Sequence, residues 1–172
     1  MKPLACLCCA LLVAACGSTR SLHNEDAPEQ SVLSEREVAL PAFPKQENLI
    51  EFYAGELTSN LFYIDPLSLS VDKEGMVRYT LVVKTSGGAT NVSFEGIRCE
   101  SRQLRLFAIG RGDGTWARVR TGEWREIENK VVNRHHVALN RDYLCPGGSM
   151  IADAADGIKA LRRGRQPEAV HF

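Results

Sequence analysis

The sequence predicts an α+β fold, in which an antiparallel, meander-like sheet carries one or two C-terminal helices on one face. Apolar segments follow one another from Val77 to Gly110 with glycine-marked breaks, as consecutive strands require. Beyond residue 133 the apolar spacing changes to three and four residues, the period of a helix. The 172 residues are 44% hydrophobic and 24% charged, which is typical of one globular domain with non-globular extensions.

The first predicted strands lie at one edge of the sheet. Leu49–Tyr53 is rich in aromatic residues and suits an edge strand. In Leu61–Val71 the apolar residues Leu67 and Leu69 alternate with serines, as a half-buried strand requires. Pro66 favours an edge position for the start of this strand, because proline has no N–H to donate.

The central strands follow after a polar turn at residues 72–75. The next strand has one apolar face, formed by Val77, Tyr79, Leu81 and Val83. In Asn91–Cys99 the apolar phase changes at Gly96, which predicts a β-bulge there. Leu104–Ile109 is apolar on both faces, so we expect it in the middle of the sheet, with a helix or loop covering its second face.

The last elements are a hairpin and two helices. Segments 115–120 and 124–127 are predicted to pair around Thr121 and Gly122. Asn133 can cap a first helix that stops before the Pro-Gly-Gly sequence at 146–148. Ser149 can cap a second helix, whose apolar residues share one face: Ile151, Ala154, Ala155, Ile158 and Leu161.

The N-terminus predicts export and lipidation. Met1-Lys2-Pro3 and the apolar run that follows form a signal peptide over residues 1–15, too short to span a bilayer as a helix. Val13-Ala-Ala-Cys16 resembles the lipobox of bacterial lipoproteins, in which the cysteine is acylated and becomes the first mature residue. Several acyl chains would hold the protein on a membrane. An ordinary signal peptide cut after an alanine is the alternative.

The remaining boundaries follow from composition. Residues 16–40 are polar and predict a flexible tether, 41–161 form the single globular domain, and 162–172 form a polar tail. Gly17 after the lipidated cysteine favours the outer membrane, by resemblance to lipoprotein sorting in Gram-negative bacteria. The 21 basic and 21 acidic residues cancel, so we expect no nucleic-acid partner.

Two cysteines, Cys99 and Cys145, remain in the mature domain and are predicted to form a disulfide. Export places them in an oxidising compartment, and one bond between them is the simplest arrangement. Closing a loop between residues 46 positions apart is worth roughly 4 kcal/mol in the chain-entropy model. A reactive thiol or a thiolate metal site is the alternative, but neither cysteine has a C-x-x-C neighbour or a nearby histidine in the sequence.

His135 and His136 do not predict a metal site. Adjacent helical residues point about 100° apart, whereas two ligands on one face need a spacing of three or four. We expect one imidazole to be packed or hydrogen-bonded and the other to be exposed, and we predict no metal and no cofactor. A role as general acid or base would need a carboxylate partner that the sequence does not locate.

Trp116 and Trp124 flank the late hairpin among arginines, including Arg111 and Arg118. Aromatic residues and arginine are enriched at interface hot spots, so these four residues are a possible surface for an envelope protein or an anionic glycan. Core tryptophans beside a solvated basic edge are the alternative.

Several blocks between Leu40 and Pro146 resemble the cryptic neisserial protein one family. They are Leu40-Pro-Ala-Phe-Pro-Lys, Arg78-Tyr-Thr-Leu-Val-Val, Asn91-Val-Ser-Phe-Glu-Gly-Ile-Arg-Cys, Ala108-Ile-Gly-Arg, Asn133-Arg-His-His and Tyr143-Leu-Cys-Pro. This resemblance implies an exported, often lipidated protein and implies no biochemical activity.

From these observations we expect a non-catalytic binding or scaffolding module, anchored to the outer membrane by lipid and facing the periplasm. No catalytic motif is found, so we expect no enzyme. The alternative is a small hydrolase or ligand carrier whose pocket forms only in three dimensions. A pocket lined by converging polar groups such as Arg78, Asp113 or His135 would favour that alternative.

Overall fold

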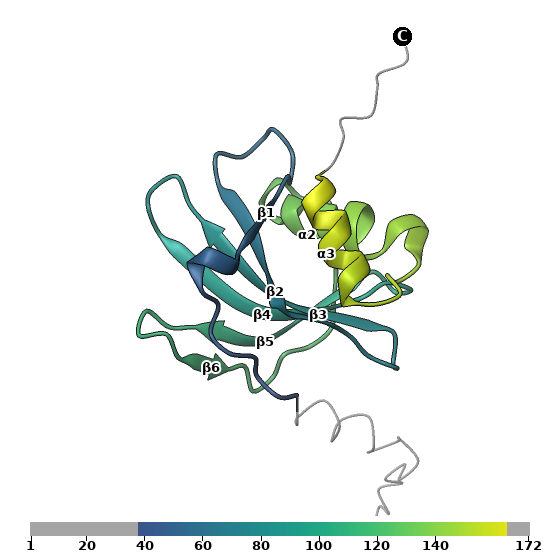
Figure 1. Ribbon diagram of the computed structural model, residues 1–172, viewed down its shortest axis with the longest axis horizontal. Helices are drawn as coiled ribbons and strands as arrows, with labels where there is room; N and C mark the ends of the chain where they lie inside the picture. The colour runs from purple at the N-terminus through teal and green to yellow at the C-terminus, as the bar shows by residue number, and fades with distance from the viewer. Residues whose placement is uncertain (1–37, 165–172) are drawn as a thin grey trace, which may run out of the picture. The chain divides into compact units, whose positions relative to one another are not determined.

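The computed structural model describes residues 38–164 (Figure 1). The predictions made for the signal peptide, for lipidation at Cys16, for the tether up to residue 37 and for the tail from residue 165 lie outside the described residues. Within the described range the fold is α+β, as predicted, with a seven-stranded antiparallel sheet and a C-terminal helical layer.

Six strands follow one another across the sheet in chain order, which confirms the meander. The strands are β1 Ile50–Phe52, β2 Leu61–Val71, β3 Met76–Lys84, β4 Thr90–Arg98, β5 Gln103–Gly110 and β6 Trp116–Arg118, and β7 Arg125–Glu126 also pairs with β5. A short 3₁₀ turn, η1 (Gln46–Asn48), precedes β1. Each of the first four turns joins neighbouring antiparallel strands, so the sheet is built from local connections.

The helical layer covers one face of the sheet, and Figure 1 shows α3 lying across it. In chain order it contains η2 Val131–Asn133, α2 Arg134–Ala138, a π-helical segment η3 Leu139–Leu144, η4 Pro146–Gly148 and α3 Ala154–Arg163. Asp153 caps α3 by accepting a hydrogen bond from the Asp156 amide at 2.9 Å. The predicted cap, Ser149, is therefore wrong, because the residues after it do not enter a helix until Ala154.

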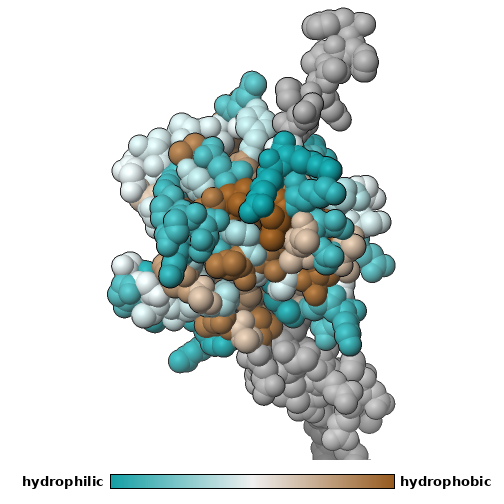
Figure 2. Space-filling view, viewed as in Figure 1, coloured by the Kyte–Doolittle hydropathy of each residue, from teal (hydrophilic) through white to brown (hydrophobic). Residues whose placement is uncertain are grey.

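The main core lies between the sheet and this layer. The face predicted for β3 is confirmed, since Val77, Tyr79 and Leu81 are buried against Leu139, Leu144 and Leu161, among others. Figure 2 shows a hydrophilic surface over the C-terminal end of α3, with hydrophobic side chains gathered beside the helix. An amphipathic helix laid on the apolar face of a sheet produces this distribution.

A second core lies on the opposite face of the sheet. It contains Met76, Phe94, Phe107 and Ala108, and it is covered by the strap, which we define as residues 38–44. Val38 is buried and Leu40 packs on the same cluster, so the packed part of the chain includes the last residues of the predicted tether. The prediction that a helix or loop covers the second face of β5 is confirmed, and the cover is a loop.

In β2 the predicted alternation is broken. Leu67 is 78% exposed, whereas Ser68 is buried, because the register with β3 shifts between Asp65 and Ser70. The Ser68 hydroxyl accepts a hydrogen bond from the Thr80 amide at 2.8 Å and donates one to the Asp65 carbonyl. The irregular stretch thus replaces ladder hydrogen bonds with side-chain ones.

Gly96 does not form the predicted bulge. It pairs regularly with Arg78 and Arg105, and the register shift between β4 and β5 falls at Phe94 and Glu95. A Cβ atom at Gly96 would lie 2.8 Å from Phe107 and 2.9 Å from Met76, so the glycine is explained by close packing in the second core.

The predicted late hairpin is also wrong. β6 and β7 do not pair with each other; β6 pairs with Ala108–Gly110 and β7 with Gln103 and Leu104, one after the other along β5. Gly122 lies between them, where a Cβ atom would lie 2.4 Å from the Leu106 carbonyl oxygen. The chain therefore follows the edge of β5 instead of folding back on itself.

In the described part of the chain, no helix is long and apolar enough to cross a membrane.

Candidate functional site

A carboxylate, Glu95, lies buried in the middle of the sheet. It is on β4, opposite Tyr79 of β3 and Leu106 of β5, and only 5% of it is exposed. It lies on the face of β4 that also carries Ile97 and Cys99, toward the helical layer. A buried charge of this kind is costly unless it is paired and hydrogen-bonded.

Three side chains bond the Glu95 carboxylate. Tyr79 Oη donates to Oε2 at 3.1 Å, and Ser93 Oγ donates to Oε1 at 2.6 Å. His136 Nε2 lies 2.9 Å from Oε2 and forms an ion pair with it when protonated. Side chains from two strands and from the helix α2 therefore meet at one carboxylate. Each of its two oxygens accepts at least one hydrogen bond.

The charge state of this network follows from its surroundings. Burial opposes the ionisation of Glu95, but His136, the hydrogen bond from Ser93 and the neighbouring His135 together outweigh it, so the pKa of Glu95 is lowered. Burial, reinforced by the charge and hydrogen bond of Glu95, raises the pKa of Tyr79 well above its usual value. At neutral pH Glu95 is therefore a carboxylate and Tyr79 a neutral phenol.

His135 is a packed neighbour of this network. Its ring stacks on Phe62 with centroids 4.8 Å apart and lies 4.0 Å from the His136 ring. Burial, with a further contribution from His136, lowers the pKa of His135 to about 4, although Glu95 acts in the opposite direction. His135 is therefore neutral at pH 7, and its role is packing.

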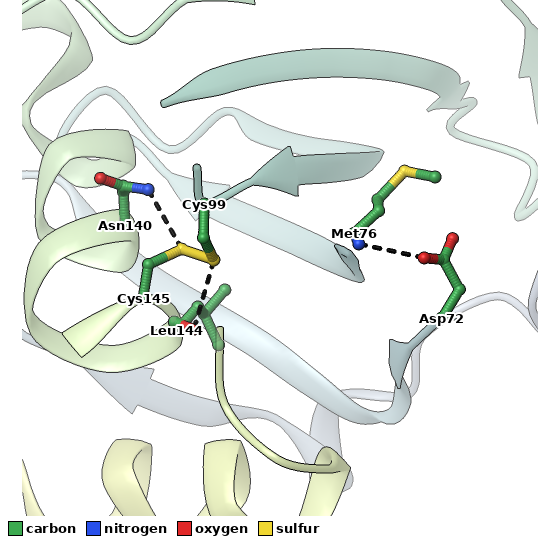
Figure 3. Close-up of a disulfide and its surroundings, with 6 residues drawn as sticks. All are labelled: Asp72, Met76, Cys99, Asn140, Leu144 and Cys145. Carbon is green, nitrogen blue, oxygen red and sulfur yellow. Dashed lines mark hydrogen bonds between the residues drawn. A yellow bond between two sulfur atoms is a disulfide. The ribbon is translucent and has the colours of Figure 1, made fainter. Parts of the chain in front are cut away.

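A disulfide fixes the segment that carries His136. Cys99 and Cys145 are bonded, with Cα atoms 5.4 Å apart, and this joins the end of β4 to the end of η3 (Figure 3). The buried Asn140 amide donates to Cys145 Sγ at 3.1 Å from within the same helical segment. The predicted pairing of the two cysteines is thus present, and it holds α2 and η3 against the strand that carries Glu95.

A hollow of about 420 Å³ opens beside His136. Its wall is formed by residues of β5, β7, η2 and α2 together with the segment that follows β7: Leu104, Arg125, Glu126, Ile127, Glu128, Asn133 and His136. We call this hollow the His136 pocket. Its lining combines the apolar residues Leu104 and Ile127 with charged and polar ones, a mixture that small-molecule sites also show.

Two of the four residues predicted as an interaction surface, Trp116 and Arg118, hold the strap. Trp116 Nε1 donates to the Pro41 carbonyl at 3.0 Å and packs on Phe43, and Arg118 donates to the Val38 carbonyl at 3.0 Å. Gly110 leaves the space that the Phe43 ring fills. Both side chains therefore have intramolecular partners in the second core.

The other two residues lie apart from them. Trp124 is covered by the Arg98 guanidinium, which lies 4.0 Å from its ring centroid, and meets Phe107 edge to face. Arg111 bonds Thr115 and the Trp116 carbonyl within the exposed turn between β5 and β6. A role for these residues in binding a partner stays a prediction.

The polar residues named as possible pocket groups do not come together. Arg78 pairs with Asp72 at 2.6 Å near the β2–β3 turn, and Asp113 bonds Thr115 in the exposed β5–β6 turn. His135 is packed on Phe62, as described above. The residue that does line a pocket beside a carboxylate is His136, the neighbour that sequence reasoning could not distinguish from His135.

Sequence reasoning also missed Glu95, although a signal was present. Counting by twos along β4, Ser93, Glu95, Ile97 and Cys99 share one face, so a charged residue stands in an otherwise core-facing row. A charged residue in that position requires a buried partner.

Within residues 38–164, no three histidine, cysteine or acidic side chains are arranged to hold a metal ion.

Comparison with known proteins gives one match. The model of the CNP1-like family matches residues 28–162, which include every strand and nearly all of the helical layer described above. The family resemblance that the sequence blocks indicated is thereby confirmed. Neither the curated proteins nor the solved structures include a significant match to the chain.

Proposed function

We propose that the chain, which belongs to the CNP1-like family, is a lipid-anchored cell-envelope protein that binds a small polar ligand in the His136 pocket. The observation that carries the proposal is the Glu95–His136 pair, bonded at 2.9 Å, with His136 on the wall of a hollow. A polar group held by a buried partner is already oriented before a ligand arrives, which lowers the cost of binding.

The rigidity of the surrounding structure supports a binding role. The disulfide between Cys99 and Cys145 fixes one end of the helical segment, and the ion pair fixes the other. Leu104 and Ile127, which line the pocket, belong to the main core and are 8% and 5% exposed. Binding to such a preformed site requires little rearrangement of the protein.

The proposed location rests on the N-terminal sequence. The charged start, the apolar run and Cys16 followed by Gly17 support export, acylation and an outer-membrane address facing the periplasm. Substituting Cys16→Ser should abolish palmitate labelling and release the protein from the membrane fraction. Normal labelling and fractionation of that variant would contradict the proposed anchor.

Binding can be tested with the small molecules extracted from the envelope. In saturation-transfer NMR, the parent domain should give signals for a bound component of this extract. Asn133→Trp, which fills the pocket, should remove these signals, whereas Lys73→Trp, on an exposed turn, should keep them. Equal signals from both variants would show that any binding occurs elsewhere.

A hydrolase is the second candidate, because a histidine bonded to a carboxylate beside a pocket is suited to proton transfer. The hydroxyl nearest this pair, Ser93, donates to Glu95 instead of contacting His136, so it is not arranged as a histidine-activated nucleophile. We therefore favour binding without reaction. Turnover of any component of the envelope extract that is lost in His136→Gln would favour the hydrolase.

A further inference from the structure

Strand pairing places one charged side chain of β7 on the same face of the sheet as the His136 pocket. Arg125 lies opposite Leu104 of β5, and residues directly opposite each other on paired strands point to the same side. Leu104 belongs to the main core, and so does Ile127, two residues after Arg125. The exposed Arg125 side chain therefore lies on the side of the helical layer, where it lines the hollow.

Glu126, the other charged residue of β7, has its side chain on the opposite face. It pairs with Gln103, and it stands two residues after Trp124, which packs on the second core. Side chains two residues apart along a strand share a face, so the Glu126 carboxylate is directed away from the hollow, although Glu126 contributes to its wall. The sheet therefore separates the two charges of β7.

Three groups on the pocket wall have hydrogen-bonding capacity that the protein does not use. Within the part of the chain that the structure describes, the Arg125 guanidinium makes no ion pair or hydrogen bond. Asn133 stands at the N-cap position of α2, but its side chain makes no capping hydrogen bond. His136 uses Nε2 for Glu95, and its other ring nitrogen, Nδ1, has no partner among residues 38–164. A guanidinium, an amide and an imidazole nitrogen thus remain for a ligand.

The other charges near the hollow are balanced within the protein. Glu128 on the wall forms an ion pair with Lys130 at 2.6 Å. The Glu95 carboxylate is balanced when His136 is protonated, and the imidazolium then donates Nε2–H to Glu95 and keeps Nδ1–H for a ligand. Among the described residues on this face of the hollow, Arg125 is therefore the one whose charge has no partner.

One unpaired guanidinium favours a ligand with one negative charge. A carboxylate accepts two parallel hydrogen bonds from a guanidinium and still has lone pairs for the Asn133 amide. A dianion such as phosphate would bring a second negative charge toward Glu128 and Glu95, whose cations are already paired. A cation would be repelled by Arg125. An uncharged molecule would displace water from the guanidinium without replacing the charge-assisted hydrogen bonds.

We infer that the ligand of the His136 pocket is a small organic acid with one carboxylate group and a short hydrocarbon body. Its carboxylate pairs with Arg125 and accepts a hydrogen bond from Asn133, and its body lies against Leu104 and Ile127, which also line the hollow. A volume of about 420 Å³ accommodates a molecule of this size. This inference rests on the proposed function, because it names the class of ligand for the same pocket.

The test uses probes that share one branched hydrocarbon body and differ in charge: isocaproate, isocaproamide and isohexylamine. Inorganic phosphate is added as a probe without a hydrocarbon body. Binding to the ¹⁵N-labelled, disulfide-bonded protein is followed at pH 7 by chemical-shift titration. Isocaproate should shift the amides of the pocket wall and should bind at least about tenfold more tightly than isocaproamide, the effect of one charge-assisted hydrogen bond. Isohexylamine and phosphate should both bind more weakly than isocaproate.

Substitutions at Arg125 test whether its guanidinium holds the carboxylate. Arg125→Gln should abolish the preference for isocaproate over isocaproamide, and Arg125→Glu should reverse the charge preference in favour of isohexylamine. Glu126→Gln, at the neighbouring position on the opposite face, is the control and should change the preference less than about twofold. Because each preference is a ratio measured on one variant, it separates a lost contact from a damaged fold.

A second pair of variants tests the contribution of the Asn133 amide. Asn133→Asp places a carboxylate on the pocket wall and should lower the ratio of isocaproate to isocaproamide binding at least about tenfold. Asn129→Asp makes the same chemical change at an exposed position outside the wall, and it should lower that ratio less than about twofold.

Any of three results would overturn the inference: equal binding of isocaproate and isocaproamide, equal effects of Arg125→Gln and Glu126→Gln, or no binding of isocaproate at about 10 mM, where even a weak site would be partly occupied. Tighter binding of phosphate than of isocaproate would also overturn it. If the envelope extract still gives saturation-transfer signals that Asn133→Trp removes, the binding function stands and only the ligand class is wrong. If those signals survive Asn133→Trp, the proposed function itself fails.

Discussion

Glu95 lies four residues before Cys99 on the same face of the chain, and both residues are bonded to the helical segment that runs from residue 134 to Cys145. One attachment is the hydrogen bond to His136 near the start of the segment, which is an ion pair when His136 is protonated, and the other is covalent, at its end. The sheet and the helical layer are thus joined along a single strand. The His136 pocket lies beside the attachment at His136, so its geometry depends on that pair.

Removing the charge of Glu95 should destabilise the domain. In Glu95→Gln the buried Tyr79, Ser93 and His136 lose the carboxylate that they bond, and we expect the free energy of unfolding in urea at pH 7 to fall by about 2–4 kcal/mol. Glu128→Gln, which breaks an exposed ion pair, should cost less than about 1 kcal/mol and serves as the control.

The double variant tests whether Glu95 and His136 act as a pair. If they do, Glu95→Gln combined with His136→Gln should cost at least about 1 kcal/mol less than the sum of the single substitutions. Strictly additive losses in the same urea experiment would mean that the two side chains contribute independently.

Acid should reduce stability through His135. The unfolded chain takes up a proton near pH 6.5, whereas the folded domain does not until about pH 4, so stability is present above pH 6.5 and is lost as the pH falls toward 4. Between pH 6.5 and 4.5 the parent should lose about 2 kcal/mol more than His135→Phe, which keeps the stacking on Phe62 but cannot be protonated.

This comparison isolates His135 because the other titrating groups are common to both proteins. Urea unfolding at several pH values gives the two stability curves. They should run parallel above pH 7 and separate below pH 6.5. Curves that stay parallel down to pH 4.5 would show that the His135 ring is freely protonated in the folded domain.

Removing the disulfide should have a large effect. Replacing Cys99 and Cys145 together by alanine opens a loop between residues 46 positions apart, and we expect a loss of about 4 kcal/mol in the free energy of unfolding. The same loss should appear when the parent is unfolded with a reductant present, and the reductant should leave the double variant unchanged. A reductant effect on the double variant would point to a different cause.

Gly96→Ala should destabilise the second core. The new methyl group would lie 2.8 Å from Phe107 and 2.9 Å from Met76, both buried, and overpacking of this kind costs about 1–3 kcal/mol. Gly112→Ala is the control, because nothing lies within 4 Å of its Cβ position. Thermal unfolding should show a lower midpoint for the first variant and little change for the second. Equal midpoints would mean that Met76 moves aside at little cost.

Much of the sheet could be predicted because its strands are linked locally. The alternation from Val77 to Val83 shows one apolar face, and short polar turns on either side leave little choice of partner strand. The same reasoning failed after Gly110. Adjacent segments were expected to form a hairpin, but β6 and β7 both pair with β5, and Gly122 between them passes too close to the Leu106 carbonyl for a larger residue.

The candidate site was less accessible to sequence reasoning. The disulfide followed from counting cysteines in a chain whose N-terminus predicts export, which needs no coordinates. The pair of Glu95 and His136 joins residues 41 positions apart, and nothing in the local pattern of either residue names the other. His135 and His136 are equivalent in sequence, and only the orientation of α2 directs one ring onto Phe62 and the other to the carboxylate.

The strap determines how the domain would respond to mechanical tension. A force transmitted along the N-terminal chain reaches the folded structure at Val38, where Arg118 and then Trp116 would bear it through their bonds to the strap carbonyls. The helical layer lies on the opposite face of the sheet and is locked to it covalently by Cys99 and Cys145. The strap should therefore detach under load while the His136 pocket keeps its shape.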